Sequence, residues 1–163
     1  MIAMIVLLMG VQGSGKTTVG RALAARLGWR FADADEFHPA ANIEKMSKGI
    51  ALDDADRAPW LAALRAEIDR TLGAGGNLVL TSSALKERYR QQLVTNGVAL
   101  VYLRGSQELI ASRLQLRTEH FAKSDLLASQ FAQLEEPTDA LTVDIRQSVK
   151  DSVTQIVTEL GLP

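Results

Sequence analysis

Residues 10–17 read GVQGSGKT and fit the phosphate-binding pattern GxxxxGK[ST] without a mismatch. The glycines permit a tight turn whose backbone N–H groups aim at phosphate oxygens, and a helix that begins there adds the positive end of its dipole. Lys16 is expected to reach the β- and γ-phosphates, and Thr17 to offer its hydroxyl to Mg²⁺. The pattern therefore predicts a nucleotide site formed by Gly10, Gly13, Ser14, Gly15, Lys16, Thr17 and Thr18.

The sequence on either side of this loop supports the prediction. Residues 4–9 form a short apolar run, and residues 17–27 have the apolar spacing of a helix. Strand, loop and helix thus follow in the order that a phosphate-binding loop requires. A glycine-rich turn that binds nothing is the alternative, but such a turn needs neither the Lys16–Thr17 pair nor a third glycine.

Two carboxylates and a histidine follow the second apolar run. Asp33 and Asp35 are two residues apart at the end of an expected strand, so both side chains can point into one cleft. We expect Asp33 to hold Mg²⁺, and Asp35 to orient an attacking hydroxyl and take its proton. His38, beside Pro39, is by itself more typical of an exposed loop, and the two acids could equally be solvated in a turn.

Two pairs of basic residues have helical spacing. Lys86 and Arg90 are four residues apart after Ser83, and could converge on one anion or form a solvated basic face. Ser83 is expected either to cap the helix that follows or to donate to a substrate oxygen. Arg113 and Arg117 have the same spacing before a polar stretch, where they could bind nucleotide phosphates under a closing lid or stabilise a helix C-terminus.

The remaining periodicity predicts alternating strands and helices. Strands are expected at 4–9, 29–34, 78–81, 99–103 and 141–145; helices at 17–27, from 53 or 54 to about 72, 85–94, 106–117, 125–134 and 149–160; and a loop with at most a short helix at 36–53. Short apolar strands separated by helices imply an α/β fold with a five-stranded parallel sheet and helices on both faces. With the loop after the first strand, this is a P-loop nucleoside triphosphate fold. It is expected to be one kinase domain over 1–163, with an acceptor-binding region at about 35–60 and a small lid at about 117–124.

Composition excludes several classes of protein. The chain has 163 residues, no cysteine and a formal net charge of −1. The lack of cysteine excludes thiolate metal sites and cysteine nucleophiles, and the charge balance gives no field toward nucleic acid or anionic membrane. No Lys or Arg precedes the first apolar run, and no other run approaches the roughly 18 residues of a membrane span. We therefore expect a cytoplasmic protein without nucleic acid or membrane partners.

Several blocks of the sequence resemble one family. DADEFHPAANIEKMSKG at 33–49 and LDDADRAPWL at 52–61 closely resemble the gluconokinases, the ATP-dependent kinases of D-gluconate. SSALKERYR at 82–90, RLQLRTEHF at 113–121 and SQFAQLEEP at 129–137 resemble segments of the same family in the same order. The resemblance spans nearly the whole chain.

The resemblance implies transfer of the γ-phosphoryl group of ATP to the 6-hydroxyl of gluconate, with Mg²⁺ as the metal. It also implies that His38 is a ligand of the sugar acid, and it points to a homodimer. A P-loop kinase of another hydroxylated acceptor, such as shikimate or a nucleoside monophosphate, is the nearest alternative. A nucleotide-dependent switch is a second, but the chain has no NKxD motif, and the acid pair with the His38 loop has no purpose in a simple switch.

Overall fold

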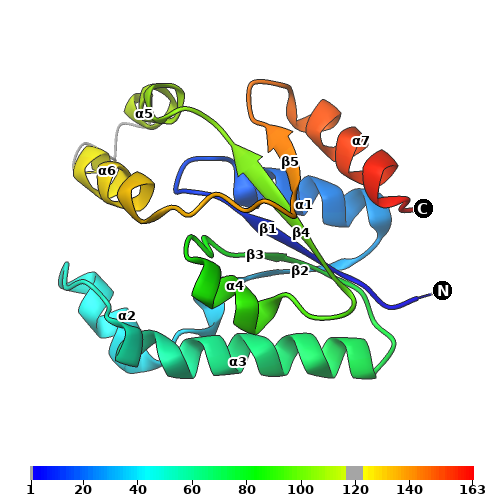
Figure 1. Ribbon diagram of the computed structural model, residues 1–163, viewed down its shortest axis with the longest axis horizontal. Coiled ribbons are helices and arrows are strands. Elements are labelled where there is room, and N and C mark those ends of the chain that lie inside the picture. The colour runs from blue at the N-terminus through cyan, green and yellow to red at the C-terminus, as the bar shows by residue number, and fades with distance from the viewer. Residues whose placement is uncertain (1, 117–122) are drawn as a thin grey trace.

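A computed structural model describes residues 2–116 and 123–163 of the chain. Five strands alternate with helices along the sequence (Figure 1). The strands are β1 (Ile5–Met9), β2 (Arg30–Asp33), β3 (Leu78–Thr81), β4 (Val98–Arg104) and β5 (Leu141–Asp144). The helices are α1 (Lys16–Leu27), the 3₁₀ turn η1 (Ala34–Phe37), α2 (Ala40–Ser47), α3 (Asp54–Gly73), α4 (Glu87–Leu93), α5 (Gln107–Gln115), α6 (Lys123–Gln133) and α7 (Val149–Leu160).

The strands form one parallel sheet in the order β2-β3-β1-β4-β5. β1 lies in the middle and is wholly buried, as its continuous apolar sequence predicts for a strand covered on both faces. Asp33 at the end of β2 pairs in register with Thr81 at the end of β3, and β3 is the direct neighbour of β1. This order brings the carboxyl ends of β2 and β1 close together with a single strand between them.

Alternate residues of β1 face two separate cores. Val6 and Leu8 pack with residues of α1, α5 and α7, whereas Ile5, Leu7 and Met9 pack with residues of α3 and α4. In Figure 1, α1 and α7 cover one face of the sheet, α3 and α4 cover the other, and both chain ends lie at the edge opposite α2 and α6. The predicted α/β fold with a parallel sheet is confirmed. No helix in the described part of the chain is long and apolar enough to cross a membrane.

Two local predictions differ from the structure. A loop with at most a short helix is predicted at 36–53, but this segment contains the end of η1 and the whole of α2. The helix expected from 85 begins at Glu87 with Lys86 as its N-cap, so the prediction that Ser83 caps it is wrong. Lys86 has an extended backbone and therefore does not share a helical face with Arg90. By contrast, Asp53 caps α3 as predicted, in a reciprocal capping box with Asp56.

Candidate active site

The phosphate-binding loop runs from the end of β1 to the start of α1 in a conformation that needs glycine. Gly13 and Gly15 have φ of 83° and 96°, in the left-handed region where a side chain is strained. A Cβ on Gly10 would lie 2.6 Å from Ser14 Oγ, and one on Gly13 would lie 3.0 Å from the side chain of Leu114 in α5. The loop is thus held between its own backbone and α5, with no space for larger residues at Gly10 or Gly13.

The amino end of α1 has no side-chain cap. Gly15 is its N-cap residue, and the first helical hydrogen bond runs from Val19 N to Gly15 O at 2.9 Å. The N–H groups of Lys16, Thr17 and Thr18 therefore precede the helical ladder and need acceptors from elsewhere. By comparison, Ser106 and Ser148 accept such bonds at the starts of α5 and α7. An uncapped start directly after a glycine turn suits a bound phosphate group.

Lys16 lies across the loop that precedes it. Its Nζ donates to Gly10 O at 2.8 Å and to Val11 O at 3.1 Å. Burial lowers the pKa of Lys16 to about 8, although the nearby carboxylates of Asp35 and Asp33 act in the opposite direction. The ammonium group is held where phosphate oxygens would favour its charged form.

The acid pair follows β2 at the same edge of the sheet. Asp33 caps η1, and its Oδ1 accepts a hydrogen bond from the backbone N–H of Asp35 at 2.9 Å. Loss of solvent around the carboxyl group and the neighbouring charge of Asp33 raise the pKa of Asp35, whereas His38 and Lys16 lower it. The two acids therefore lie near Lys16 of the phosphate loop, and the role of Asp35 as a proton acceptor stays a prediction.

The site contains hydroxyl oxygens besides the carboxylate of Asp33. Thr17 is the second residue of α1. Thr81, which pairs with Asp33, has a buried hydroxyl without a hydrogen-bond partner among the described residues. Mg²⁺ is commonly held by only one or two protein oxygens, with phosphates and water completing its coordination. No cluster of three or more metal-ligating side chains occurs within the part of the chain that the structure describes. The side chains of Thr17 and Asp33 carry the oxygen atoms that Mg²⁺ prefers, and their role as its ligands stays a prediction.

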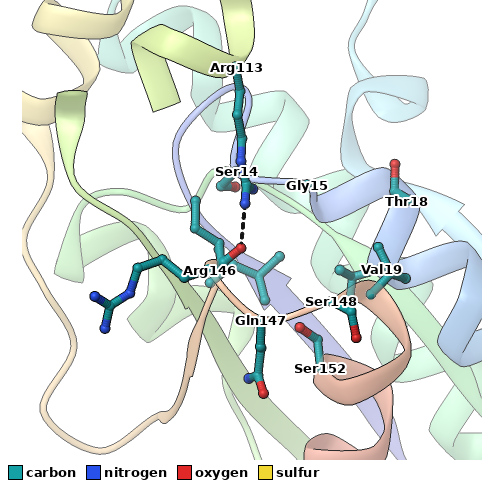
Figure 2. Close-up of a pocket in the computed structure, with 12 residues that line it drawn as sticks. Ser14, Gly15, Thr18, Val19, Arg113, Arg146, Gln147, Ser148 and Ser152 are labelled. Atoms are coloured by element: carbon teal, nitrogen blue, oxygen red, sulfur yellow. Dashed lines mark hydrogen bonds between the residues drawn. The ribbon is translucent and has the colours of Figure 1, made fainter. Parts of the chain in front are cut away.

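A pocket of about 360 Å³ opens beside the phosphate loop. Ser14, Gly15 and Thr18 form one wall, and Arg113 of α5 reaches in to donate to Ile145 O at 2.6 Å (Figure 2). Arg113 therefore lies beside the phosphate loop, and its contact with a nucleotide stays a prediction.

The opposite wall comes from a loop that sequence reasoning missed. Arg146, Gln147 and Ser148 connect β5 to α7 and line the pocket (Figure 2). The available signal was positional, because loops at the carboxyl ends of parallel strands bind ligands in open α/β sheets. The pocket therefore lies next to the phosphate loop and is lined by both polar and apolar residues.

His38 is fixed by α2 and α3. Its ring stacks on Trp60 with centroids 4.4 Å apart and an angle of 10° between the planes. Nδ1 lies 3.1 Å from Nδ2 of the buried Asn42. Burial lowers the pKa of His38, Asp35 raises it, and Arg57 lowers it further. His38 is therefore an ordered, half-buried side chain rather than the exposed loop histidine that its local sequence suggested.

Arg90 has a structural position that the sequence did not indicate. Its guanidinium is buried and donates to the carbonyl oxygens of Ala84, Leu85 and Glu135 at 2.8, 3.0 and 2.7 Å, and to Glu87 Oε2 at 2.9 Å. These bonds hold the loop between β3 and α4, in which Ala84 has a strained φ of 44°. The idea that Lys86 and Arg90 converge from one helical face is wrong, because Lys86 precedes the helix. Lys86 and Ser83 remain half-buried on the loop that Arg90 organises.

Arg57 is a cation near His38 that the sequence analysis did not single out. Its Nη1 donates to Tyr89 Oη at 3.2 Å, and its guanidinium carbon lies 5.6 Å from the centre of the Tyr89 ring. Asp54 accepts hydrogen bonds from both Tyr89 and Arg88. Arg117 and most of the expected lid at about 117–124 lie outside the described residues.

A glycine-rich phosphate loop after β1, an uncapped helix start and an acid pair at the end of β2, one strand away from β1, define a P-loop kinase of a small molecule. The family model described as an AAA domain matches residues 5–141. The chain is 50% identical over 133 residues to a gluconokinase of Gluconobacter oxydans, covering 80% of this chain and 75% of that protein. It is 40% identical to the thermoresistant gluconokinase of Escherichia coli, covering 94% and 91% of the two chains.

A crystal structure of a gluconokinase from Sinorhizobium meliloti superposes with a TM-score of 0.86 at 39% identity, covering 98% of this chain and 93% of that one. Together, these similarities over most of the chain show that it belongs to the gluconokinase family.

Proposed function

We propose that the protein transfers the γ-phosphoryl group of ATP to the 6-hydroxyl of D-gluconate, giving 6-phosphogluconate and ADP. The observation that carries the proposal is the meeting of Lys16, Asp33 and Asp35 at one sheet edge, since each carboxylate acts on the charge of the Lys16 ammonium group. Membership of the gluconokinase family supports the choice of acceptor.

In the proposed reaction, the loop N–H groups and Lys16 orient the triphosphate. The 6-oxygen of gluconate forms a bond to the γ-phosphorus while the bond to the β,γ-bridging oxygen breaks, and that oxygen leaves on ADP. The proton of the 6-hydroxyl passes to Asp35, whose raised pKa makes it a better acceptor than an ordinary aspartate. Mg²⁺, held by Thr17 and Asp33, would neutralise charge on the phosphates when bound. Arg113 would bind the nucleotide, and Arg117 stays a prediction for the same role.

The acceptor would occupy the side of the site formed by η1, α2 and the start of α3. His38, Ser83 and Lys86 are the proposed ligands of gluconate. Arg57 supplies positive charge next to His38, a place that Arg90 does not fill because its donors are used by backbone carbonyls. A carboxylate bound without an overall positive field needs such local cations.

The test is ADP release by the purified protein with Mg²⁺ and ATP. The acceptors are D-gluconate, shikimate, other sugar acids, glucose and nucleoside monophosphates, with an acceptor-free reaction as control. We expect release that depends on gluconate, and no release with Lys16→Ala. Release that depends on another acceptor would identify a different kinase, and release that needs no acceptor would favour the nucleotide switch.

Two further expectations belong to this proposal. A cytoplasmic location follows from the use of ATP, and fractionation of cells would test it. A homodimer follows from the family resemblance, and light scattering on the purified protein would test it.

A further inference from the structure

Asn42 has a geometry that defines the chemical state of His38. The Asn42 side chain is buried, with 2% of its surface exposed, and its Nδ2 makes two contacts. One is to the backbone carbonyl oxygen of Asp56 at 2.9 Å, and the other is to Nδ1 of His38 at 3.1 Å. A carbonyl oxygen only accepts hydrogen bonds, so the atom between Asp56 and His38 is the amide nitrogen. The orientation of the Asn42 amide is therefore fixed independently of the histidine.

The state of His38 follows from that orientation. An amide nitrogen carries two hydrogens and donates both, so Nδ1 of His38 must accept and cannot carry a hydrogen. The hydrogen of the neutral ring then sits on Nε2. An imidazolium would place an N–H group directly against the N–H of Asn42, which disfavours protonation in addition to burial.

Trp60 fixes the ring in the remaining directions. Its indole N–H donates to Ala34 O in η1 at 2.7 Å, and its face stacks on the His38 ring. Asn42 therefore holds one edge of the ring and Trp60 holds one face. Nε2 is the polar atom left over, and no described residue forms a hydrogen bond with it.

We propose that Asn42 and Trp60 are positioning residues that keep His38 as the neutral Nε2–H tautomer, so that His38 donates a hydrogen bond to an oxygen of the acceptor and cannot take its proton. The proposal rests on the proposed function for the identity of the acceptor. It leaves Asp35 as the base, since the Nε2 lone pair is absent and the Nδ1 lone pair is used by Asn42.

The charged groups around His38 are compatible with this state. Asp35 in η1 favours the imidazolium, whereas Arg57 from α3 opposes it, and burial is the largest influence, so the pKa of His38 lies below its ordinary value. The ring is therefore neutral at pH 7 in the unliganded protein.

The direct test is a long-range ¹H–¹⁵N spectrum of the ¹⁵N-labelled protein between pH 6 and 8. The signal of His38 is the one that disappears in His38→Gln. We expect the pattern of the Nε2–H tautomer in the wild type, without any substitution. A predominant Nδ1–H tautomer, or an imidazolium at pH 7, would overturn the proposal.

Asn42→Ala tests the link between this tautomer and the acceptor. We expect a mixture of tautomers, a His38 pKa closer to 6.5, and a gluconate KM raised roughly two- to tenfold, the range for one hydrogen bond. The KM for ATP should not change. Asn77→Ala is the matched control, because Asn77 also joins two segments by accepting a hydrogen bond from Met4 N at 2.9 Å. Asn77 lies just before β3, at the opposite end of the strand from the site.

The result against the proposal would be an unchanged tautomer in Asn42→Ala, or a changed tautomer with an unchanged gluconate KM. Circular dichroism and urea unfolding establish that the variant is folded. Absence of gluconate-dependent ADP release from the wild type would overturn the proposed function and the donor role with it, whereas the spectrum of the unliganded protein decides the tautomer separately.

Discussion

Lys16 is a buried cation in the phosphate-binding loop, so a bound nucleotide would change its protonation. Its pKa is lowered by burial to about 8, so a part of the molecules lacks the Lys16 proton near that pH. Phosphate oxygens favour the ammonium form and so raise this pKa. Binding of ATP near pH 8 should therefore take up a fraction of a proton, and much less at pH 6.5, where Lys16 is already charged.

Calorimetry in buffers of different ionisation enthalpy measures this uptake. Lys16→Arg is the control, because a guanidinium stays protonated at these pH values and has no proton to gain. Subtracting the proton uptake of Lys16→Arg from that of the wild type also removes protons that the nucleotide itself takes up or releases. Equal uptake by wild type and Lys16→Arg would show that Lys16 is not the source.

Asp35→Asn keeps the size of the side chain and removes the proposed base. We expect kcat to fall by about 10² to 10⁴, the usual range for loss of a general base, with little change in the affinity for ATP. In the wild type, activity should fall as pH falls through the raised pKa of Asp35, so the acid limb should lie above that of an ordinary aspartate. The limb should be absent in the variant. A defect confined to ATP binding would contradict the role of Asp35 at the acceptor.

At the scale of elements, Arg90 joins the loop before α4 to the segment after α6. Its carbonyl partners Ala84 and Glu135 are 51 residues apart in the sequence. Arg90→Lys cannot reach all of these oxygens and leaves some of them buried without partners. We expect a loss of about 3 kcal/mol in the free energy of unfolding. We also expect a higher KM for gluconate, because Ser83 and Lys86 lie on the loop that Arg90 holds.

Urea unfolding and acceptor kinetics measure the two effects of Arg90→Lys. Arg88→Lys is the control on the same helix, since Arg88 is an exposed cation that pairs with Asp54 at 2.9 Å. Arg88→Lys should destabilise the protein much less than Arg90→Lys does, because exposed ion pairs contribute little to stability. Similar costs for both variants would mean that the buried network of Arg90 does not hold the loop.

This network also explains which elements the sequence could predict. β3 and α7 begin and end at the predicted residues. The apolar run of β3 and the periodic apolar spacing of α7 after a serine are signals within the segments themselves. The start of α4 was misplaced because the loop at Ala84 and Leu85 is stabilised by Arg90 and Glu135, a contact between distant segments. A short sequence pattern around α4 does not indicate a contact with a residue as distant as Glu135.

The same distinction applies to the site. Lys16 could be predicted because it belongs to the phosphate-loop pattern. Asp33 and Asp35 could be predicted because they lie two residues apart at the end of an expected strand. The sequence predicts only a helix around Trp60 and a loop around Asn42, yet the side chains of both residues contact His38 because α2 folds against α3. The Arg146–Ser148 loop has no motif of its own, and only its place after β5 connects it to the nucleotide pocket.

At the scale of the whole molecule, the proposed function places the nucleotide and the acceptor against different elements at the carboxyl ends of the strands. The pocket beside the phosphate loop is lined from α1, α5 and the loop after β5, whereas His38 is held by α2 and α3. Any ligand that binds only the folded state raises its stability, by about 2.7 kcal/mol at a concentration of 100 times Kd. For a domain of this size that corresponds to a rise in Tm of roughly 5–10 °C.

Substitutions on the two sides should therefore separate the two ligand effects. Arg113→Gln should reduce the rise in Tm caused by ATP with Mg²⁺ and leave that caused by gluconate, because Arg113 lies in the wall of the pocket beside Ser14. His38→Gln should do the reverse, since its contacts are with Asn42 and Trp60. Differential scanning fluorimetry of wild type and both variants with each ligand alone measures this. If either variant lost both effects to the same extent, the two sides would form one undivided site, and the assignment of the acceptor to η1, α2 and α3 would fail.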